Sequence, residues 1–318
     1  MEKSLETSNF GEPDSTRPPI RHHLEGIEMP TSNSIVSSKF LDFDSVQDKN
    51  MQTFLVVLNF SLPTATARLW PKTAYKICAD GGTNRLFDAL PTMLGISGEE
   101  VNVTRSAYLP DIVIGDLDSI REDVRTFYSS KDVPILDLSH DQDTTDLGKC
   151  LMHIDSLLAS SQQSCRGSAG HVASSISDWS TPESGAKEVM TSPFRDHQII
   201  VVGAMGGRLD HILSNLNALY QFSHLKITLW GEGNLVRLLP KGRSLITPLK
   251  GLEGPSCGLV PLSGPAVATS SGLKWNLQDT KMEVSGLIST CNVIESEEVI
   301  VTTDRELLWI TAVSEDWF

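Results

Sequence analysis

Strand-length apolar runs and helix-like segments alternate between residue 51 and residue 225. Each of five apolar runs ends in a turn or a polar stretch; they are TFLVVLNF (53–60), YKICAD (75–80), DIVIGD (111–116), PILDL (134–138) and HQIIVVGAM (197–205). After the last two runs, apolar residues recur at helical spacing, for example at Leu147, Leu151 and Ile154. Continuous apolar strands are buried on both faces, so the pattern predicts an α/β fold with a mainly parallel sheet and helices on both faces.

The pattern changes near residue 226. From there the chain shows short β-type runs broken by Gly, Pro, Asn and Asp; they are KITLW, NLVRLLP, GLVPLS, LKWNLQ, KMEVSGLIST, VIVTT and LLWITAV. Such a series predicts an all-β second domain, a sandwich or a small barrel. We therefore expect an α/β domain at 51–235, followed by a β-sandwich domain at 236–318.

Two segments carry neither pattern. Residues 1–50 are polar and contain prolines, and residues 159–196 are rich in serine. Neither composition supplies enough apolar surface for a core. We expect the first segment to be a disordered N-terminal tail and the second to be a flexible insertion in the α/β domain.

Composition narrows the classes of partner. The chain has 318 residues and a formal net charge of −14, whereas a surface for nucleic acid or anionic membrane needs clustered Lys and Arg. No apolar run reaches the roughly 18 residues of a membrane helix. Five cysteines without CxxC spacing indicate a reduced chain, and the first residues lack the apolar centre of a secretion signal. These features predict a cytoplasmic (cytosolic) protein that binds no nucleic acid and no membrane.

Acidic residues gather where four of the predicted strands end; they are Asp80, Asp116, Asp118, Asp141, Asp143, Asp146 and, beside Arg208, Asp210. In open α/β sheets the carboxyl ends of parallel strands meet at one edge, where ligands bind. Carboxylates this close repel one another unless a cation or a proton intervenes. Mg²⁺ suits such a group, since it binds one or two carboxylates together with substrate phosphates and water.

Glycine pairs occupy the corresponding position after two of the strands. Gly81–Gly82 follows the second apolar run, and Gly206–Gly207 follows the fifth. Glycines at a helix N-terminus let backbone N–H groups approach phosphate oxygens. The sequence therefore predicts a divalent cation between Asp116 and Asp118 that bridges to a phosphorylated substrate.

Each feature has a simpler interpretation when taken alone. Asp141 and Asp143 can cap a helix, and Asp80 can be an ordinary acid of a βα turn. His140 and His211 are candidate proton carriers, although single histidines beside acids are more often structural. The chain has no GxxxxGK[ST] motif, so a Walker-type kinase is not expected. The joint occurrence of four such strand ends favours the ligand-binding interpretation.

A set of motifs gives the chain a resemblance to a known family. The motifs are ICADGGTNRLFD, DIVIGDLDSI, DQDTTDLGKC, GGRLDHILSNLNALY, SGLKWNL and GLISTCN. In this order, over roughly residues 51–318, they resemble eukaryotic thiamine pyrophosphokinase (thiamin diphosphokinase), and the plant enzymes most of all. The resemblance implies a homodimer with a shared active site. It also implies Mg²⁺-dependent transfer of the pyrophosphoryl group of ATP to the hydroxyl of thiamine, giving thiamine diphosphate and AMP.

The resemblance also implies roles for individual positions. The expected catalytic residues are Asp116, Asp118, Asp143, Asp146 and Lys149, of which Asp116, Asp118 and Asp146 match the metal-binding acids. The positions expected at ATP and its phosphates are Asp80, Gly81, Gly82, Asn84, Thr145, Arg208 and Asp210. Those expected at thiamine are Gln142, Trp275, Ser289 and Asn292. Either Asp143 or Asp146 is expected to accept the proton of the reacting hydroxyl.

The residue types agree chemically with these roles. Pyrophosphoryl transfer depends on positioning and on neutralising spread negative charge, which Mg²⁺, Lys149 and Arg208 could supply. The indole of Trp275 can hold the thiazolium ring by stacking and cation–π attraction, worth about 0.5–2 kcal/mol. Without the resemblance, packing between sheets is the ordinary interpretation of this tryptophan. Leu117 stands where the family has an aromatic residue or Met, and it is expected to pack inward.

Two other functions stay open at this point. A metal-dependent glycosyltransferase would use Asp116 and Asp118 to hold a metal and a nucleotide-sugar diphosphate, would prefer Mn²⁺ and would ignore thiamine. A non-catalytic sensor would bind a nucleotide or thiamine without turnover. The nucleotide formed from thiamine, ATP and Mg²⁺ discriminates among the three.

Overall fold

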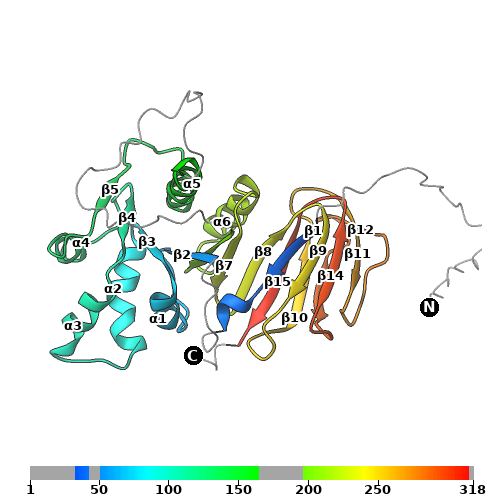
Figure 1. Ribbon diagram of the computed structural model, residues 1–318, viewed down its shortest axis with the longest axis horizontal. Coiled ribbons are helices and arrows are strands. Elements are labelled where there is room, and N and C mark those ends of the chain that lie inside the picture. Colours follow the sequence, from blue (N-terminus) through cyan, green and yellow to red (C-terminus); the bar gives the residue numbers. More distant parts are fainter. Residues whose placement is uncertain (1–32, 43–50, 165–195, 315–318) are drawn as a thin grey trace, which may run out of the picture. The chain divides into compact units, whose positions relative to one another are not determined.

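The structure is a computed structural model that describes residues 33–42, 51–164 and 196–314, with only the backbone for residues 161–164 (Figure 1). The helices are α1 (Thr66–Leu69), α2 (Gly82–Met93), α3 (Glu100–Ala107), α4 (Glu122–Ser129), α5 (Asp146–Ser164) and α6 (Leu209–Gln221), with the 3-10 turns η1 (Lys39–Leu41) and η2 (Trp70–Lys72). The first strands are β1 (Asn33–Ser37), β2 (Met51–Val57), β3 (Tyr75–Ala79), β4 (Ile112–Gly115), β5 (Ile135–Asp137), β6 (Asp196–Val202) and β7 (Ile227–Gly231). The remaining strands are β8 (Asn234–Leu239), β9 (Gly242–Thr247), β10 (Glu253–Val260), β11 (Ala266–Ser271), β12 (Thr280–Met282), β13 (Ser289–Val293), β14 (Val299–Thr303) and β15 (Leu307–Val313).

A parallel sheet with helices on both faces forms the first part of the fold, as the sequence predicts. Its strand order is β7-β6-β2-β3-β4-β5, and every neighbouring pair is parallel. Alternate residues of β2 face opposite cores: Leu55 and Val57 pack with α1, α2 and α4, whereas Phe54 and Val56 pack with α5 and α6. Figure 1 shows these two groups of helices on the two sides of the sheet. The α/β fold class is therefore confirmed.

The strand order reverses between β2 and β6. From β2 the chain moves outward through β3, β4 and β5, then returns to place β6 on the other side of β2. At such a switch point the loops after the two neighbouring strands diverge and leave a crevice at the carboxyl edge, which is the usual ligand position in α/β sheets. Here those loops begin at Leu58 and Gly203.

The same sheet continues into the second part of the fold without a break. Beyond β7 it runs antiparallel through β8, β15, β10 and β13. A second sheet, in the order β1-β9-β14-β11-β12, encloses with it a core that includes Leu239, Ile246, Val301 and Trp309. The expected β-sandwich is confirmed.

One expected strand in this part is wrong. Residues 273–278 (LKWNLQ) form no strand and contribute a single bridge, from Leu273 to Ile294. The side chain of Asn276 accepts the N–H of Leu273 (3.1 Å), and the Ser270 hydroxyl accepts the N–H of Leu277 (2.9 Å). Local side-chain bonds of this kind divert backbone groups from a strand ladder.

The expected disordered tail ends earlier than residue 50. Residues 33–41 form β1 and η1, and β1 pairs in parallel with β9. Apolar residues within this segment explain its order: Leu41 is 1% exposed in the α/β core, and Val36 packs against the sandwich core. The expected insertion likewise begins later, because α5 continues to Ser164. The rest of both segments lies outside the described residues.

A buried ion pair joins β8 to the start of β10. Arg237 donates through Nη1 to Glu253 Oε1 (2.9 Å) and through Nε to the Thr228 hydroxyl (3.1 Å). Glu253 also accepts the hydroxyls of Thr311 (2.7 Å) and of Ser38, which precedes η1. Burial acts to raise the pKa of Glu253, but the Arg237 charge and these hydrogen bonds outweigh burial and lower the pKa. The pair thus ties the N-terminal segment to both parts of the fold.

Candidate active site

Three carboxylates meet at the ends of β3 and β4. Each of Asp80, Asp116 and Asp118 places one oxygen within 4.8 Å of the others. Among the described residues, they are the one group of three or more possible metal-ligating side chains this close together. Asp80 is 1% exposed, whereas Asp116 and Asp118 reach solvent. The sequence placed these acids at neighbouring strand ends, and the fold brings them together. Such an all-oxygen donor set fits a hard divalent cation.

Asp80 also holds the loop that carries the other two acids. Its two oxygens accept the N–H groups of Ser119 and Ile120, both at 3.0 Å. Asn84, one turn further on, donates to the Ser119 carbonyl (2.8 Å) and accepts the Arg121 N–H (3.0 Å). Burial raises the pKa of Asp80, although the hydrogen bonds that Asp80 accepts from the backbone of Ser119 and Ile120 act against the rise. Asp80 and Asn84 were expected at the phosphates, and here they fix the backbone of the acidic loop.

The loop itself has an unusual backbone. Leu117 has φ of 64°, a left-handed conformation that is costly for a residue with a Cβ. Its side chain packs against the α/β core, so the expected inward position is confirmed. The turn leaves Asp116 and Asp118 on the solvent side, with Asp116 accepting the Asp118 N–H (3.4 Å). Leu117 therefore anchors the turn that presents the two acids.

Lys149 supplies a buried positive charge beside this cluster. Its Nζ lies 3.9 Å from Asp116 Oδ2 and 3.9 Å from Asp146 Oδ1, and its side chain is 1% exposed. Asp146 is the first residue of α5. Burial, followed by the charges of Asp80 and Asp116, raises the pKa of Asp146 to about 6. Asp146 therefore shares the charge of Lys149 with Asp116, but it does not belong to the three-carboxylate group.

Asp146→Asn is expected to stabilise the metal-free protein at pH 7 by about 1–2 kcal/mol, a figure discounted for partial exposure. A carboxyl whose pKa is raised in the folded state destabilises the folded protein when it ionises. This loss develops as the pH rises from the ordinary pKa of the carboxyl, 3.8, to its folded-state pKa of about 6. The gain should therefore be full at pH 7 and vanish near pH 4. Thermal unfolding in EDTA at both pH values measures it, and an equal gain at both would contradict the assignment.

A pocket of about 610 Å³ opens at the switch point beside these acids. Asp116, Thr145 and Asp146 are among the residues that line it. The remaining lining residues include Asn59, Phe60, Ser119, Thr144, Gly206, Gly207, Arg208, His211, Ser214 and Asn215. Sequence reasoning missed Asn59, Phe60, Ser119, Thr144, Ser214 and Asn215. The first two could have been found, since they are the last residues of the predicted strand 53–60, at the carboxyl edge where ligands bind.

The Gly206–Gly207 turn is built around an aromatic ring. Gly206 has φ of 103°, and a Cβ on either glycine would clash with the Phe60 ring. Gly82 is similarly required, because a Cβ there would clash with the carbonyl of Val57 at the end of β2. Both glycine pairs thus allow close packing at the carboxyl edge of the sheet, and only the second pair lines the pocket.

Of the other predicted phosphate residues, Thr145 and Arg208 line the pocket, whereas Asp210 does not. Arg208 donates to Asp210 from Nε (3.1 Å) and Nη2 (2.5 Å), and both side chains are exposed. The Thr145 hydroxyl caps α5 by accepting the Gly148 N–H (3.2 Å). Gln142 and Asp143 are exposed and do not line the pocket; the Gln142 amide donates to the Ser139 carbonyl (2.7 Å).

The three residues expected at thiamine in the β-sandwich form one cluster. The side chain of Asn292, a residue that is 3% exposed, accepts the backbone N–H of Trp275 (3.2 Å) and donates to the Trp275 backbone carbonyl (2.8 Å). It also donates to the Ser289 hydroxyl (3.3 Å). The Trp275 side chain is 55% exposed, so it is not a core residue between the sheets. None of the three lines the pocket at the acidic edge.

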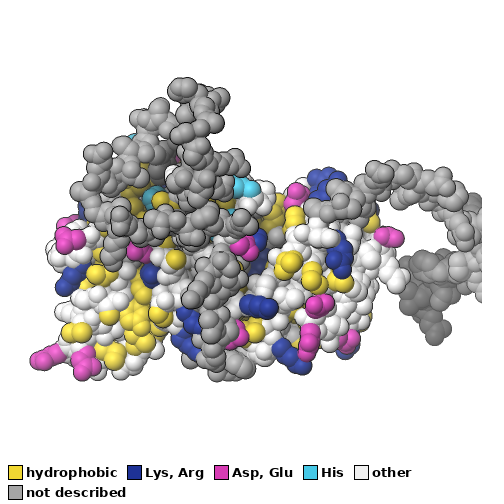
Figure 2. Space-filling model, in the orientation of Figure 1, with side chains coloured by type: hydrophobic (Ala, Val, Ile, Leu, Met, Phe, Trp, Pro, Cys, Tyr) yellow, Lys and Arg dark blue, Asp and Glu magenta, His cyan; other side chains and the backbone are white. Residues whose placement is uncertain are grey.

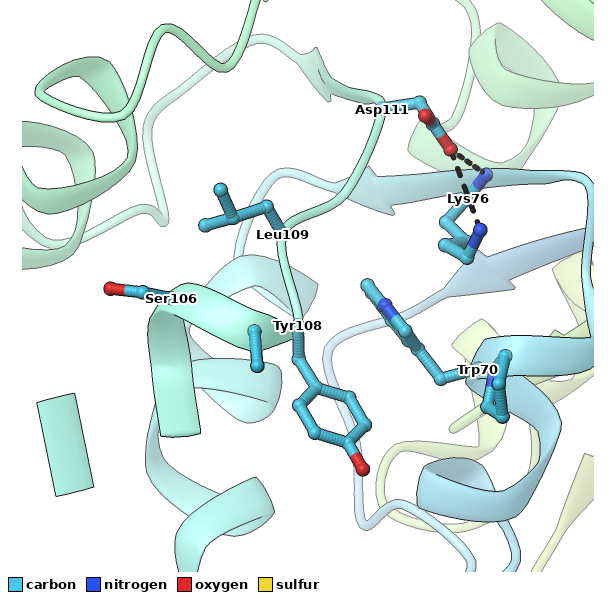
Figure 3. Close-up of a pocket in the computed structure, with 8 residues that line it drawn as sticks. Trp70, Lys76, Ser106, Tyr108, Leu109 and Asp111 are labelled. Carbon is cyan, nitrogen blue, oxygen red and sulfur yellow. Dashed lines mark hydrogen bonds and ion pairs between the residues drawn. The ribbon is translucent and has the colours of Figure 1, made fainter. Parts of the chain in front are cut away.

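A second pocket, of about 540 Å³, lies at the opposite ends of β3 and β4 (Figure 3). Asp111 accepts the Lys76 N–H there (2.8 Å), and the rings of Trp70 and Tyr108 lie 5.9 Å apart. Its lining includes none of the clustered acids or the glycine turns. The pocket at the acidic edge is therefore the candidate active site.

Three further features concern the surface charge, the helices and the cysteines of the described residues. On the face shown in Figure 2, Lys and Arg side chains are scattered among acidic ones and form no single basic patch over the described residues. No described helix has the length and apolar character needed to span a membrane. The four cysteines in the described ranges, Cys78, Cys150, Cys257 and Cys291, are free.

Comparison with known proteins agrees with the geometry. The model of the thiamin pyrophosphokinase catalytic domain matches residues 66–230, and that of the vitamin B1 binding domain matches residues 243–308. Thiamine pyrophosphokinase 1 of Oryza sativa subsp. japonica is 37% identical over 88% of this chain and 98% of its own length. Thiamine pyrophosphokinase 1 of Arabidopsis thaliana is 40% identical over 81% of this chain and 85% of its own length. A solved structure of thiamin pyrophosphokinase from Candida albicans has a TM-score of 0.67 and 25% identity, over 91% of this chain and 95% of that one. The expected similarity to the plant enzymes is confirmed, and the chain belongs to the thiamine pyrophosphokinase family.

Proposed function

We propose that this chain transfers the pyrophosphoryl group of ATP to the hydroxyl of thiamine in a Mg²⁺-dependent reaction, giving thiamine diphosphate and AMP. Membership of the family supports thiamine diphosphorylation. The single observation that carries the finer proposal is the carboxylate group of Asp80, Asp116 and Asp118, with buried Lys149 beside it, next to the switch-point pocket that Asp116 lines. Within the described residues, no other site combines a pocket with clustered acids.

The residues at the acidic edge suit a metal-bound diphosphate. Asp116 and Asp118 would hold Mg²⁺, because both oxygens of Asp80 already accept backbone N–H groups. Bound there, Mg²⁺ would neutralise phosphate charge and align the attacked phosphorus. Lys149 lies close enough to Asp116 to share in that neutralisation. Arg208 would reach the phosphates by exchanging its exposed pairing with Asp210.

Of the two proposed proton acceptors, Asp146 is favoured over Asp143. Asp146 lines the pocket, whereas Asp143 is exposed outside it. Burial also raises the pKa of Asp146 to about 6, close to the operating pH, where a general base is most effective. Asp146 is therefore the proposed acceptor of the thiamine hydroxyl proton.

The separation of the two residue clusters supports a homodimer with a shared active site. The proposed thiamine cluster in the β-sandwich consists of Trp275, Ser289 and Asn292. These residues do not line the switch-point pocket of their own chain. A second subunit would bring its β-sandwich to that pocket and complete the site. The free cysteines support a cytosolic location.

Trp275→Ala is expected to raise the KM for thiamine by about twofold to thirtyfold, the loss of one cation–π and stacking contact. The KM for ATP and the melting temperature should stay unchanged, because the side chain is 55% exposed. Steady-state kinetics with each substrate varied in turn measures the effect. A change confined to the KM for ATP would place thiamine elsewhere.

The direct test is to incubate the purified protein with thiamine, ATP and Mg²⁺ and to identify the products by chromatography. AMP formed one-for-one with thiamine diphosphate is expected. ADP with thiamine monophosphate would mean transfer of a single phosphoryl group. Binding without any thiamine-dependent product would instead favour a sensor, and turnover of a nucleotide sugar with Mn²⁺ would favour a glycosyltransferase.

A further inference from the structure

Three polar side chains at the start of α2 bind the acidic loop, residues 116–121. Asn84 and Asp88 are four residues apart and share one face of α2, and Asp80 lies two residues before the helix begins. Asp80 and Asn84 bind the backbone of residues 119–121, as described above. Asp88 binds the same segment through the side chain of Arg121. The loop is therefore held at its buried end by Asp80 and toward its exposed end by α2.

The outermost contact is a two-pronged ion pair. The Arg121 guanidinium donates to Asp88 through Nη1 (2.6 Å) and Nη2 (2.8 Å), and Nε donates to Asp123 (3.2 Å). Hydrogen bonding to Arg121 lowers the pKa of Asp88. The two side chains are 43% and 53% exposed, so the pair adds little to global stability despite its ideal geometry.

The loop needs restraint of this kind because its backbone is strained. Leu117 is a non-glycine residue in the left-handed region, and so is Asp80 with φ of 38°. Strained residues persist only where the surrounding contacts over-determine them. The backbone N–H of Arg121 is bound by Asn84 while its side chain is bound by Asp88, so Arg121 closes the loop at its far end.

We propose that Asp88 and Arg121 are positioning residues that hold the loop bearing Asp116 and Asp118 in its metal-binding conformation. The role of that conformation rests on the proposed function, whereas the restraint of the loop does not. Neither residue lines the pocket, and both act through the backbone of residues 119–121.

The restraint is tested in the full-length protein by amide hydrogen exchange, without substrate. The variants are Asp88→Ala and Arg121→Lys, since lysine keeps the charge and cannot form the two-pronged pair. Amides in peptides spanning residues 116–121 should exchange about fivefold faster in both variants, the upper range for loss of an exposed pair. Unchanged exchange in both would overturn the proposal.

Arg105→Ala is the matched control. Arg105 also binds α2 next to Asp88, donating to the Phe87 carbonyl (3.0 Å) and stacking on the Phe87 ring at 3.5 Å, but it makes none of the contacts to the loop. It should leave exchange of residues 116–121 unchanged even if it lowers the melting temperature. Equal acceleration in the control would show a general loosening of α2 and would overturn the proposal.

The consequence for the metal is read from the Mg²⁺ dependence of turnover. The half-saturating Mg²⁺ concentration should rise about fivefold in Asp88→Ala, while kcat at saturating Mg²⁺ and the KM for thiamine stay within twofold. The double variant with Arg121→Ala should be no worse than Asp88→Ala alone, because the two side chains share one contact to α2, and the other bond of Arg121, to Asp123, does not reach that helix. Loss of kcat without a shift in Mg²⁺ dependence would overturn the positioning role. Absence of thiamine-dependent product in the unmodified protein would count against the proposed function alone, since hydrogen exchange still tests the restraint.

Discussion

Asp116→Asn is expected to lower thiamine-dependent kcat/KM by about 10²–10³-fold or more while the protein stays folded. Asp116 belongs to the three-carboxylate group and also faces Lys149 at 3.9 Å. Asparagine keeps the size of the side chain but removes one negative charge from the proposed Mg²⁺ site, so the metal and the phosphates lose their alignment. Product formation over a Mg²⁺ titration measures the effect, and the melting temperature verifies the fold.

Asp137→Asn is the matched control for this variant. Asp137 also ends a parallel strand, β5, but it is exposed and bonds only locally to Ser139 (2.9 Å) among the contacts described here. Its substitution should leave turnover within about twofold, as expected for a surface position away from the reaction. Wild-type rates in Asp116→Asn would remove the metal hypothesis, and equal losses in both variants would mean that any strand-end charge matters.

Glu253→Gln is expected to reduce the free energy of unfolding by about 3–5 kcal/mol. The substitution leaves the charge of Arg237 buried without its carboxylate, and Arg237 is only 4% exposed. Equilibrium denaturation measures the loss. Glu283→Gln removes the acid of a surface pair with Lys281 (3.6 Å) and should cost less than about 1 kcal/mol. A loss below 1 kcal/mol in Glu253→Gln would show that water or rearrangement compensates Arg237.

The same pair makes a signed prediction for pH. The folded-state pKa of Glu253 lies below its ordinary value of 4.5, so its contribution is complete above pH 4.5 and is lost as pH falls through the lowered pKa. The difference in stability between the natural protein and Glu253→Gln should therefore be constant from pH 7 to about 5 and shrink in stronger acid. A difference that grows as pH falls would reverse the assigned direction.

The parallel part of the fold was predictable because its strands are buried on both faces. Continuous apolar runs such as 53–60 and 111–116 mark such strands without ambiguity, and the acids that follow them had to meet at one edge. The strands β9 and β11 were not found. Their buried positions alternate with exposed ones and are filled in part by Gly, Ser and Ala, which give little apolar signal.

The site was predictable in its acids but not in their supports. Asp80, Asp116 and Asp118 stand out by charge and spacing. Nothing in the sequence showed that both carboxylate oxygens of Asp80 would accept hydrogen bonds from the loop backbone. Pairings between distant residues, such as Asp88 with Arg121, depend on the packing of α2 against the loop and leave no local pattern.

The place of β1 in the second sheet sets an order of events during synthesis. Ser34 lies 210 residues before its partner Ser244, so β1 leaves the ribosome long before β9 exists. At about 5–20 residues per second, the delay is on the order of 10–40 seconds. The parallel sheet, which needs only residues 51–231, can assemble during this interval. The first described strand of the chain is then among the last to dock.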